Sequence, residues 1–271
     1  MNYKQNLHMH STFCDGKDTP EQVIETALQK GFDSIGFSSH SYTSYSSEYT
    51  IKEGKEEIYK EHILSLKKKY DGKIDVFLGI EFDTAADSLP YGYDYIIGTV
   101  HSVNTFDGVK SFDRSADYVE NLINTYFQGN GMAYAKAYFE RLSHLARLEN
   151  IDIIGHFDII TKHCETRDFF DMNSKDYLLW ATDTMDALRG KIPFFEINTG
   201  AISRGYRTTP YPAVTLIKEL KARGFLPVIT SDCHDRNFLD CEFDTCEKLL
   251  KDCGFNEKYV LTKDGWKGIK L

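Results

Sequence analysis

The sequence predicts an α/β protein in which seven strand-and-helix units form a TIM-like barrel. Short apolar runs of strand length alternate with helical patterns along the 271 residues. This alternation implies parallel strands, because a parallel return needs a crossover long enough to hold a helix. No glycine-rich dinucleotide-binding motif follows the first run, which favours a closed barrel over an open doubly wound sheet. The length suits one large barrel, so we expect a single domain over residues 1–271.

The predicted strands share one feature: each stops at, or within a few residues of, a histidine or a carboxylate. They are Asn6–His10, Asp33–Phe37, Asp75–Ile80, Asp94–Val100, Ile151–Gly155, Ile192–Ile197 and Leu226–Thr230. In β/α barrels the catalytic groups come from the carboxyl ends of different strands. The pattern therefore predicts a metal site at the C-terminal ends of the strands.

The first predicted helix has clear start and stop signals. Thr19 is typical of an N-cap, Pro20 of the first helical position and Gln22 of a capping-box partner, while Gly31 ends the helix. The other expected helices are Ile51–Lys69, Ala133–Leu148, Ser174–Leu188, Pro210–Arg223 and Phe243–Asp252. The less regular segment Asn104–Gly131 is expected to be a long, partly helical excursion over the active face.

Composition and charge narrow the class of protein. The content of 41% hydrophobic residues is enough for a large core, and the net charge of -9 argues against nucleic acid or an anionic membrane as a partner. If the substrate is anionic, bound divalent cations would reverse the local field.

The chain shows no secretory signal and no apolar run long enough to cross a bilayer, so we expect a cytoplasmic protein. The six cysteines show no metal-binding spacing and are expected to be reduced thiols.

The candidate metal ligands are the histidines and carboxylates at the strand ends. His8 and His10 lie two residues apart and can face the same side of a strand, and Asp232 and His234 repeat that spacing. The whole set is His8, His10, Asp15, His40, Glu81, His101, His156, Asp232 and His234.

Each of these residues also has a structural interpretation. Asp15 precedes Gly16 and is a common turn residue, and a single histidine at a strand end is more often a hydrogen-bonded core residue. A carboxylate such as Glu81, placed directly after an apolar strand, is costly to bury without a cation. The repetition across the chain favours a metal site. The remaining histidines, His62, His144 and His163, do not end strands and are expected to have no metal role.

Two arginines are candidate substrate-binding residues. Arg204 and Arg207 follow the strand that ends near Asn198, and two guanidinium groups on a loop over the barrel mouth suit a phosphate. A solvated loop that pairs with surface acids is the competing interpretation.

The histidine and carboxylate motifs resemble those of the polymerase and histidinol phosphatase (PHP) family. The resemblance spans nearly the whole chain, and the loop Ser203–Arg207 is most similar to that of the histidinol-phosphate phosphatases. It implies a distorted (β/α)7 barrel that binds three divalent ions. Family members often carry a histidine where this chain has Asp15.

Carried over by position, the resemblance assigns ligands to each ion. The first ion takes His8, His10, Glu81 and Asp232, the second takes Glu81, His101 and His156, and the third takes Asp15, His40 and His234. Glu81 thus bridges two ions. Nitrogen and oxygen ligands without thiolate fit zinc, manganese, iron or cobalt.

The activity implied by the resemblance is hydrolysis of a small-molecule phosphate monoester, L-histidinol phosphate, to L-histidinol and inorganic phosphate in histidine biosynthesis. Adjacent cations lower the pKa of a water held between them, and the resulting hydroxide attacks phosphorus in line. An alkoxide is a poor leaving group, so Asp232 or His234 is expected to donate a proton to it.

Other functions are compatible with the same residues. The alternatives are a nuclease, a phosphotyrosine-protein phosphatase, or a metal-binding module without catalysis. The acidic composition disfavours the nuclease, and a complete ligand set with a bridging carboxylate is more than a structural module needs. Glu165 and Asp168 are candidate partners for the substrate amine on charge alone. The oligomeric state is left open.

Overall fold

The computed structural model describes residues 3–271, and its centre is a parallel sheet of seven strands in the order β1-β2-β3-β4-β7-β8-β9. They correspond to the seven strands that the sequence predicts, but the first is shorter than predicted. It ends at Asn6, so His8 and His10 follow the strand and do not lie on it. The bounds of the seven strands are Gln5–Asn6, Ser34–Phe37, Asp75–Asp83, Tyr95–Thr99, Ile153–Ile154, Phe194–Asn198 and Leu226–Thr230. The predicted (β/α)7 barrel is confirmed.

The sheet closes next to the predicted ligands. The two outer strands, β1 and β9, are linked by an isolated parallel bridge between Met9 and Cys233. Backbone hydrogen bonds flank this bridge: the His10 N–H donates to Cys233 O over 2.8 Å, and the Cys233 N–H donates to His8 O over 3.2 Å. Because β1 and β7 have only two residues each, the barrel is irregular.

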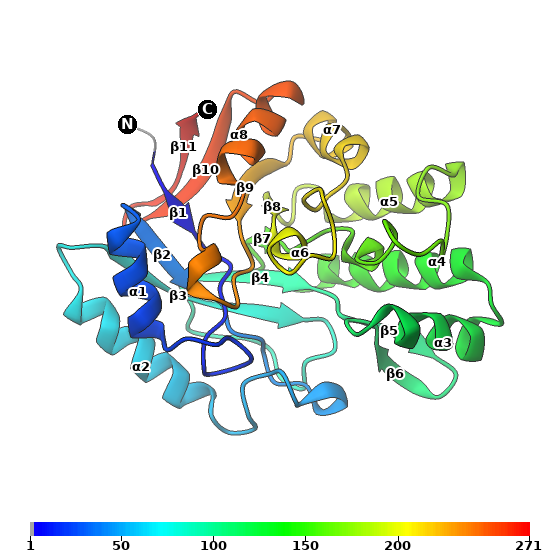
Figure 1. The fold of residues 1–271 in the computed structure, drawn as a ribbon, viewed down its shortest axis with the longest axis horizontal. Coiled ribbons are helices and arrows are strands. Elements are labelled where there is room, and N and C mark those ends of the chain that lie inside the picture. The colour runs from blue at the N-terminus through cyan, green and yellow to red at the C-terminus, as the bar shows by residue number, and fades with distance from the viewer. Residues whose placement is uncertain (1–2) are drawn as a thin grey trace.

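Helices lie around the outside of the strands (Figure 1). They are α1 Pro20–Gln29, α2 Glu56–Lys69, α3 Ala116–Phe127, α4 Gly131–Leu142, α5 Lys175–Leu188, α6 Gly200–Ser203, α7 Val214–Ala222 and α8 Phe243–Asp252. Helix α1 has the predicted capping box between Thr19 and Gln22. The predicted bounds of α8 are confirmed, and α5 begins directly after its N-cap Ser174. Short 3-10 turns lie at Ser44–Ser46, Ser143–Arg147, Ile159–Thr161 and Arg236–Phe238.

Two predicted helix starts are wrong. Helix α2 begins at Glu56 rather than Ile51, because Gly54 has a φ of 70° and this left-handed conformation interrupts a helix. Helix α7 begins at Val214 rather than Pro210, because Tyr211 forms an antiparallel bridge with Asn198. That bridge holds the chain after α6 against the end of β8.

The segment Asn104–Gly131 is partly helical, as predicted, but it also contains an unpredicted hairpin. Strands β5 (Ser102–Thr105) and β6 (Gly108–Ser111) form this hairpin, and α3 follows it. The Phe112 N–H donates to His101 O over 3.0 Å, so the chain returns to the end of β4 after the hairpin.

A second unpredicted hairpin lies at the opposite end of the barrel. Strands β10 (Glu257–Thr262) and β11 (Gly265–Lys270) pack beside β1 (Figure 1). Gln5 and Leu261 exchange two hydrogen bonds of 2.7 and 2.8 Å, and Trp266 stacks on Phe194 with ring centroids 4.1 Å apart. The hairpin therefore covers the amino-terminal ends of the strands with apolar side chains and leaves the other end for chemistry.

The structure also bears on the state of the cysteines and on the lengths of the apolar helices. The six cysteines all lie in the described part of the chain and all are free thiols, as expected. Among residues 3–271, no helix combines the length and the apolar character that crossing a bilayer requires.

Candidate metal centre

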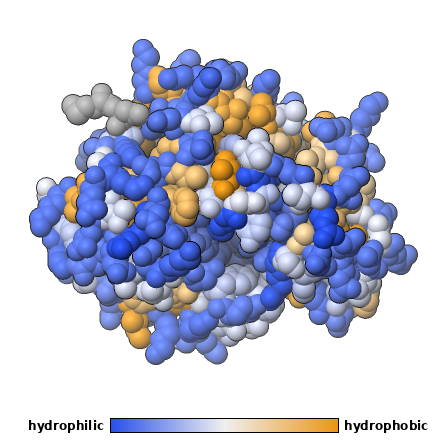
Figure 2. Space-filling view, viewed as in Figure 1, coloured by the Kyte–Doolittle hydropathy of each residue, from blue (hydrophilic) through white to orange (hydrophobic). Residues whose placement is uncertain are grey.

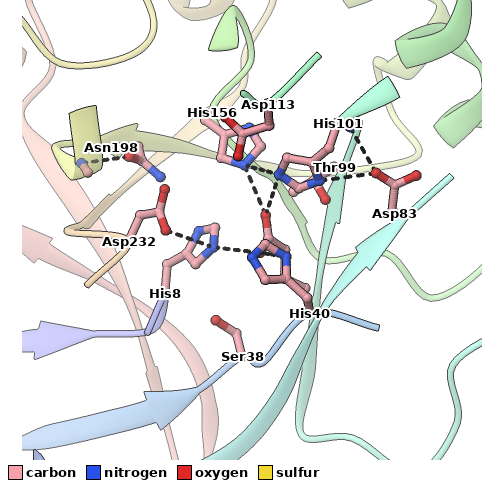
Figure 3. Close-up of polar contacts among 12 residues, drawn as sticks. His8, Ser38, His40, Asp83, Thr99, His101, Asp113, His156, Asn198 and Asp232 are labelled. Atoms are coloured by element: carbon pink, nitrogen blue, oxygen red, sulfur yellow. Dashed lines mark hydrogen bonds and ion pairs between the residues drawn. The ribbon is translucent and has the colours of Figure 1, made fainter. Parts of the chain in front are cut away.

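All of the predicted metal ligands converge at the carboxyl ends of the strands. Within each of four groups, one nitrogen or oxygen atom per side chain lies within 4.8 Å of those of the others. The groups are His10–Asp15–His40–His234, His8–Glu81–His156, His8–His10–Asp232 and His40–Glu81–His101. The imidazoles of His8, His40, His101 and His156 point toward a shared centre (Figure 3).

The first candidate ion position lies between β1, β3 and the end of β9. His10 Nε2 lies 3.1 Å from Asp232 Oδ1 and 3.5 Å from Glu81 Oε2, and His8 Nε2 lies 3.3 Å from Glu81 Oε2. His8 Nε2, His10 Nε2 and Glu81 Oε2 are buried without a hydrogen-bond partner among the described residues. Buried polar atoms are normally satisfied. These atoms face one another, as donors around one cation would.

The second candidate position uses the other oxygen of Glu81. Oε1 lies 2.9 Å from His156 Nε2 and 3.2 Å from His101 Nε2, and the two imidazole nitrogens are 3.2 Å apart. Glu81 thus presents one oxygen to each position. This is the geometry that a bridging carboxylate requires.

The third candidate position is more exposed. Asp15 Oδ2 lies 3.3 Å from His234 Nε2, and its Oδ1 lies 3.8 Å from His40 Nε2. His10 also approaches, with Nδ1 3.6 Å from Asp15 Oδ1 and its ring stacked on that of His234 at 4.0 Å. Asp15 belongs to this cluster, although it also lies in the predicted turn.

The donor chemistry of these positions fits divalent cations. The donors are imidazole nitrogens and carboxylate oxygens, a set that suits zinc, manganese, iron or cobalt. Nitrogen and oxygen atoms without hydrogen bonds face each other at the first position, and a divalent cation bound between them would satisfy both.

The neighbouring charges in the cluster shift the pKa values of its carboxylates and imidazoles. Burial raises the pKa of Glu81, but His40 and His8 outweigh burial and hold this pKa well below its usual value. Burial and the neighbouring His234 and His40 lower the pKa of His10 to about 3. A metal binds carboxylates that are ionised and imidazoles that are neutral, and Glu81 and His10 are in these forms. Burial lowers the pKa values of His8 and His101, but the carboxylates beside them outweigh burial and hold these pKa values well above the usual one. A bound metal would therefore displace a proton from each of these two imidazoles.

Two further carboxylates, Glu196 and Asp83, orient the histidines. Neither was given a role on the basis of the sequence. Glu196 Oε1 lies 2.6 Å from His8 Nδ1, and Glu196 Oε2 accepts a hydrogen bond of 2.8 Å from the His156 N–H. Asp83 Oδ2 accepts from the His101 N–H over 2.8 Å and lies 3.0 Å from His101 Nδ1. A carboxylate on one ring nitrogen fixes the tautomer and aims the other nitrogen at the ion.

A sequence signal existed for both positioning residues. Asp83 lies two residues beyond Glu81 on β3, and Glu196 lies two residues before Asn198 on β8. Two-residue spacing on a strand places side chains on the same face. Strand alternation would therefore have placed both carboxylates near the mouth, without showing that they bind histidine rather than metal.

Arg204 lies beside the candidate metal ligands, at the barrel mouth where the sequence predicted it. Its Nη2 donates to Asp232 Oδ2 over 3.1 Å, and its Nη1 lies 2.7 Å from His234 Nδ1. A side chain at Gly200 would place its Cβ 2.7 Å from Asp232 Oδ2 and 2.9 Å from Arg204 Nη2. A glycine at the start of α6 is therefore what lets this ion pair sit against the helix.

The structure places Arg207 differently from the prediction. Its guanidinium is buried, with Nη1 donating to Thr161 O over 3.2 Å and Nη2 to Thr209 Oγ1 over 3.1 Å. The guanidinium also packs over the Tyr211 ring at 4.9 Å. Because its donors are already engaged by the protein, Arg207 braces the loop after α6 instead of facing a substrate.

A cavity of about 480 Å³ adjoins the candidate metal ligands. It is lined by Asp15, Lys17, Asp113, Lys162, Ser203, Arg204, Tyr206, His234, Asp235 and Phe238. The volume is in the range of small-molecule sites. Figure 2 shows a hollow near the middle of the same face, bordered mainly by hydrophilic residues. Lys162 and Asp113 were not predicted as site residues.

The sequence-based candidates for the amine partner do not reach this cavity. Glu165 accepts hydrogen bonds from the Thr208 N–H over 2.8 Å and from Thr209 Oγ1 over 3.3 Å, and Asp168 is exposed. Neither lines the cavity. The remaining histidines, His62, His144 and His163, belong to none of the ligand groups found among residues 3–271.

Comparisons with known proteins agree with this architecture. A family model described as the PHP domain matches residues 6–200. A probable histidinol-phosphatase of Schizosaccharomyces pombe is 24% identical over 292 residues, covering 94% of this chain and 89% of the relative.

Solved structures show the same fold. A putative histidinol phosphatase of Listeria monocytogenes matches with a TM-score of 0.77 and 18% identity, covering 89% of this chain and 99% of that chain. A histidinol phosphate phosphatase of Lactococcus lactis, complexed with zinc, L-histidinol and phosphate, matches with a TM-score of 0.72 and 18% identity, covering 97% and 98%. Since the family model matches well over half of the sequence, the chain belongs to the PHP domain family.

Proposed function

We propose that the protein is a metal-dependent phosphomonoesterase that hydrolyses L-histidinol phosphate to L-histidinol and inorganic phosphate. The observation that carries the proposal is the convergence of the histidine and carboxylate groups beside a small cavity that also contains Arg204 and Lys162. The relative in Schizosaccharomyces pombe, named as a probable histidinol-phosphatase, supports this choice of substrate.

Three divalent ions would occupy the cluster. His8, His10, Glu81 and Asp232 would hold the first, Glu81, His101 and His156 the second, and Asp15, His40 and His234 the third. Bound divalent ions would lower the pKa of a coordinated water and neutralise the phosphate oxygens. The protein supplies the fixed positions, because Glu196 and Asp83 hold the imidazoles of His8 and His101 in place.

Arg204 is the protein's own phosphate-binding group in this proposal. Its Nε is buried without a hydrogen-bond partner among the described residues, while its two terminal nitrogens contact Asp232 and His234. A planar guanidinium at the rim of the cluster can donate to the phosphate oxygens and hold them for in-line attack.

The proton for the leaving alkoxide would come from Asp232 or His234. Both touch Arg204, so the group that binds phosphate also fixes the two candidate donors. Asp232→Asn and His234→Asn variants with verified metal content would distinguish them. We expect the donor variant to lose more activity on an alkyl phosphate than on an aryl phosphate, whose leaving group needs no proton. Equal losses on both substrates for both variants would remove this role.

A substrate panel tests the function itself. Metal-replete protein would be assayed against histidinol phosphate, other alkyl phosphates, aryl phosphates, phosphotyrosyl peptide and single-stranded DNA, with elemental analysis alongside. We expect the highest kcat/KM on histidinol phosphate. Preferential turnover of the peptide or of DNA would instead support the protein phosphatase or the nuclease, and no turnover of any ester would support a non-catalytic module.

A further inference from the structure

Asp113 is an acidic residue of the cavity that the proposed chemistry does not use. It follows β6 and is carried to the metal cluster by Phe112, whose N–H donates to His101 O over 3.0 Å. Its carboxylate lies close enough to His101 for the two side chains to interact electrostatically (Figure 3). It belongs to none of the ligand groups found in residues 3–271, yet it lines the same cavity as Arg204 and His234.

Half of the Asp113 carboxylate is engaged by the protein. Lys162 Nζ donates to Oδ1 over 2.7 Å, and Lys162 is itself held over the Tyr206 ring at 4.2 Å. Within the described chain no other hydrogen bond reaches this carboxylate, so Oδ2 is left for a ligand. The ion pair also places a cation and an anion side by side on the cavity wall.

The other two carboxylates that line the cavity, Asp15 and Asp235, already have partners. Asp15 belongs to the candidate third metal position. Asp235 accepts from Asn237 N–H over 3.0 Å with Oδ1 and from Lys17 Nζ over 3.1 Å with Oδ2. Asp113 is therefore the carboxylate of this cavity that, within residues 3–271, keeps an oxygen available.

The substrate carries complementary charges. In L-histidinol phosphate the ammonium group is on the carbon next to the one that bears the phosphate ester, so a cation lies a short distance from the dianion. When the phosphate lies at the metal cluster beside Arg204, the ammonium must lie on a nearby wall of the same cavity. A partly buried carboxylate is the group that would recognise it, because hydrogen bonds between ionised groups are the strong ones.

We propose that Asp113 binds the ammonium group of the substrate through Oδ2, and that it thereby selects amino-alcohol phosphates over alkyl phosphates without an amine. This inference rests on the proposed phosphomonoesterase function. Lys162 positions the carboxylate by holding Oδ1. The residues that the sequence offered for this role, Glu165 and Asp168, lie outside the cavity.

The test compares two substrates on two matched variants. The substrates are histidinol phosphate and the analogue in which hydrogen replaces the amino group. The variants are Asp113→Asn and the control Asp168→Asn, which makes the same change at an exposed position. We expect the wild-type protein to prefer the amine substrate by about 10- to 100-fold in kcat/KM, the range of a charged hydrogen bond. Asp168→Asn should keep this preference.

Asp113→Asn should lose most of the preference through a higher KM for histidinol phosphate. Its kcat/KM for the analogue should stay within about threefold of the wild-type value, because that substrate never contacts Oδ2. Asp113→Glu keeps the charge and should recover part of the preference. Metal content and melting temperature would be measured for each variant.

The possible results distinguish a failure of the Asp113 assignment from a failure of the phosphomonoesterase function. If Asp113→Asn keeps the full preference, or loses activity equally on both substrates, Asp113 does not bind the amine. Equal wild-type turnover of the two substrates would also overturn the inference and leave the phosphomonoesterase function standing. Failure of the metal-replete wild type to hydrolyse either ester would overturn the proposed function itself.

Discussion

Asp232 joins the candidate metal cluster through a backbone geometry that the sequence did not predict. Its two-residue spacing from His234 suggested two side chains on one face of a strand. In the structure β9 ends at Thr230, and Asp232 has a φ of 46°, in the left-handed region that few residues other than glycine adopt. A turn therefore brings both side chains to the cluster. Strained backbone of this kind is concentrated at functional sites.

Glu196 offers a direct test of the positioning role. Glu196→Gln keeps the shape of the side chain but removes the charge that holds His8 Nδ1 and weakens the contact to the His156 backbone. We expect metal affinity to fall about 10- to 100-fold, as for other partners of metal-bound histidines. Competition with a chelator of known affinity measures this. Glu165→Gln, which alters a glutamate outside the cavity, is the control, and equal metal affinity in both variants would contradict the role.

The two arginines should respond differently to the same substitution. Arg204→Ala removes a guanidinium from the cavity and should lower kcat/KM for phosphate monoesters by about 10- to 100-fold, mainly through KM. Steady-state kinetics on metal-replete protein would show this.

Arg207→Ala should act on stability instead. It removes buried hydrogen bonds to Thr161 and Thr209 and should lower the free energy of unfolding by about 2 kcal/mol, measured by urea denaturation. If Arg207→Ala raised KM without lowering stability, the original assignment of Arg207 to the substrate would be right.

At the scale of secondary structure, the sequence predicted the parallel strands well because each is a short apolar run with a polar ending. Helix starts were less predictable, since they depended on backbone features such as the left-handed Gly54 and the bridge between Tyr211 and Asn198. Both hairpins were overlooked. The β10–β11 hairpin did carry a signal, the Asp264–Gly265 turn between two strand-like runs.

The residues of the candidate site were likewise predictable only where they follow a regular strand. Most of the candidate metal ligands lie at or shortly after the end of a strand and were predictable from that pattern, whereas Asp15 lies in a turn. Asp113 and Lys162 lie on irregular segments that are brought together by the hairpin before α3 and the turn after β7. No periodicity in the sequence encodes that contact.

An ion-pair cluster near the start of β1 links three secondary-structure elements and is expected to stabilise the fold. Asp240 accepts from Lys4 over 2.7 Å and from Lys30 over 2.6 Å, which ties the chain before β1 and the end of α1 to the turn before α8. All three side chains are partly buried. Asp240→Asn should reduce the free energy of unfolding by about 1 kcal/mol at neutral pH.

The pH dependence of this effect has a definite sign. Although burial raises the pKa of Asp240, its hydrogen bonds to Lys30 and Lys4 lower this pKa overall. The stabilisation is therefore fully present above the unfolded-state pKa of about 3.9 and is lost as the pH falls through the lower folded-state value. Urea denaturation of the wild type and Asp240→Asn should give converging stabilities at acidic pH. A difference that persisted unchanged there would contradict the assignment.

For the whole molecule, the decisive feature is that closure of the barrel brings the segments after its first and last strands together at the candidate metal centre. His8 and His10 follow β1, Asp232 and His234 follow β9, and the bridge between Met9 and Cys233 locks these segments together. The family match ends at residue 200, so the last two ligands lie beyond it. An acidic protein with a net charge of -9 can bind an anionic phosphate ester if bound cations offset its charge at the site. Several of the acidic side chains lie in the candidate metal groups and would face such cations.

Metal reconstitution is the most direct test of the central claim that these side chains form a catalytic polynuclear centre. Chelator-stripped protein would be titrated with Zn²⁺ or Mn²⁺ while bound metal and hydrolysis of histidinol phosphate are measured on the same samples. We predict that the stripped protein is inactive and that activity returns only as more than one ion binds per chain, with up to three at saturation. Full activity in protein shown to be free of divalent transition metals would contradict the account.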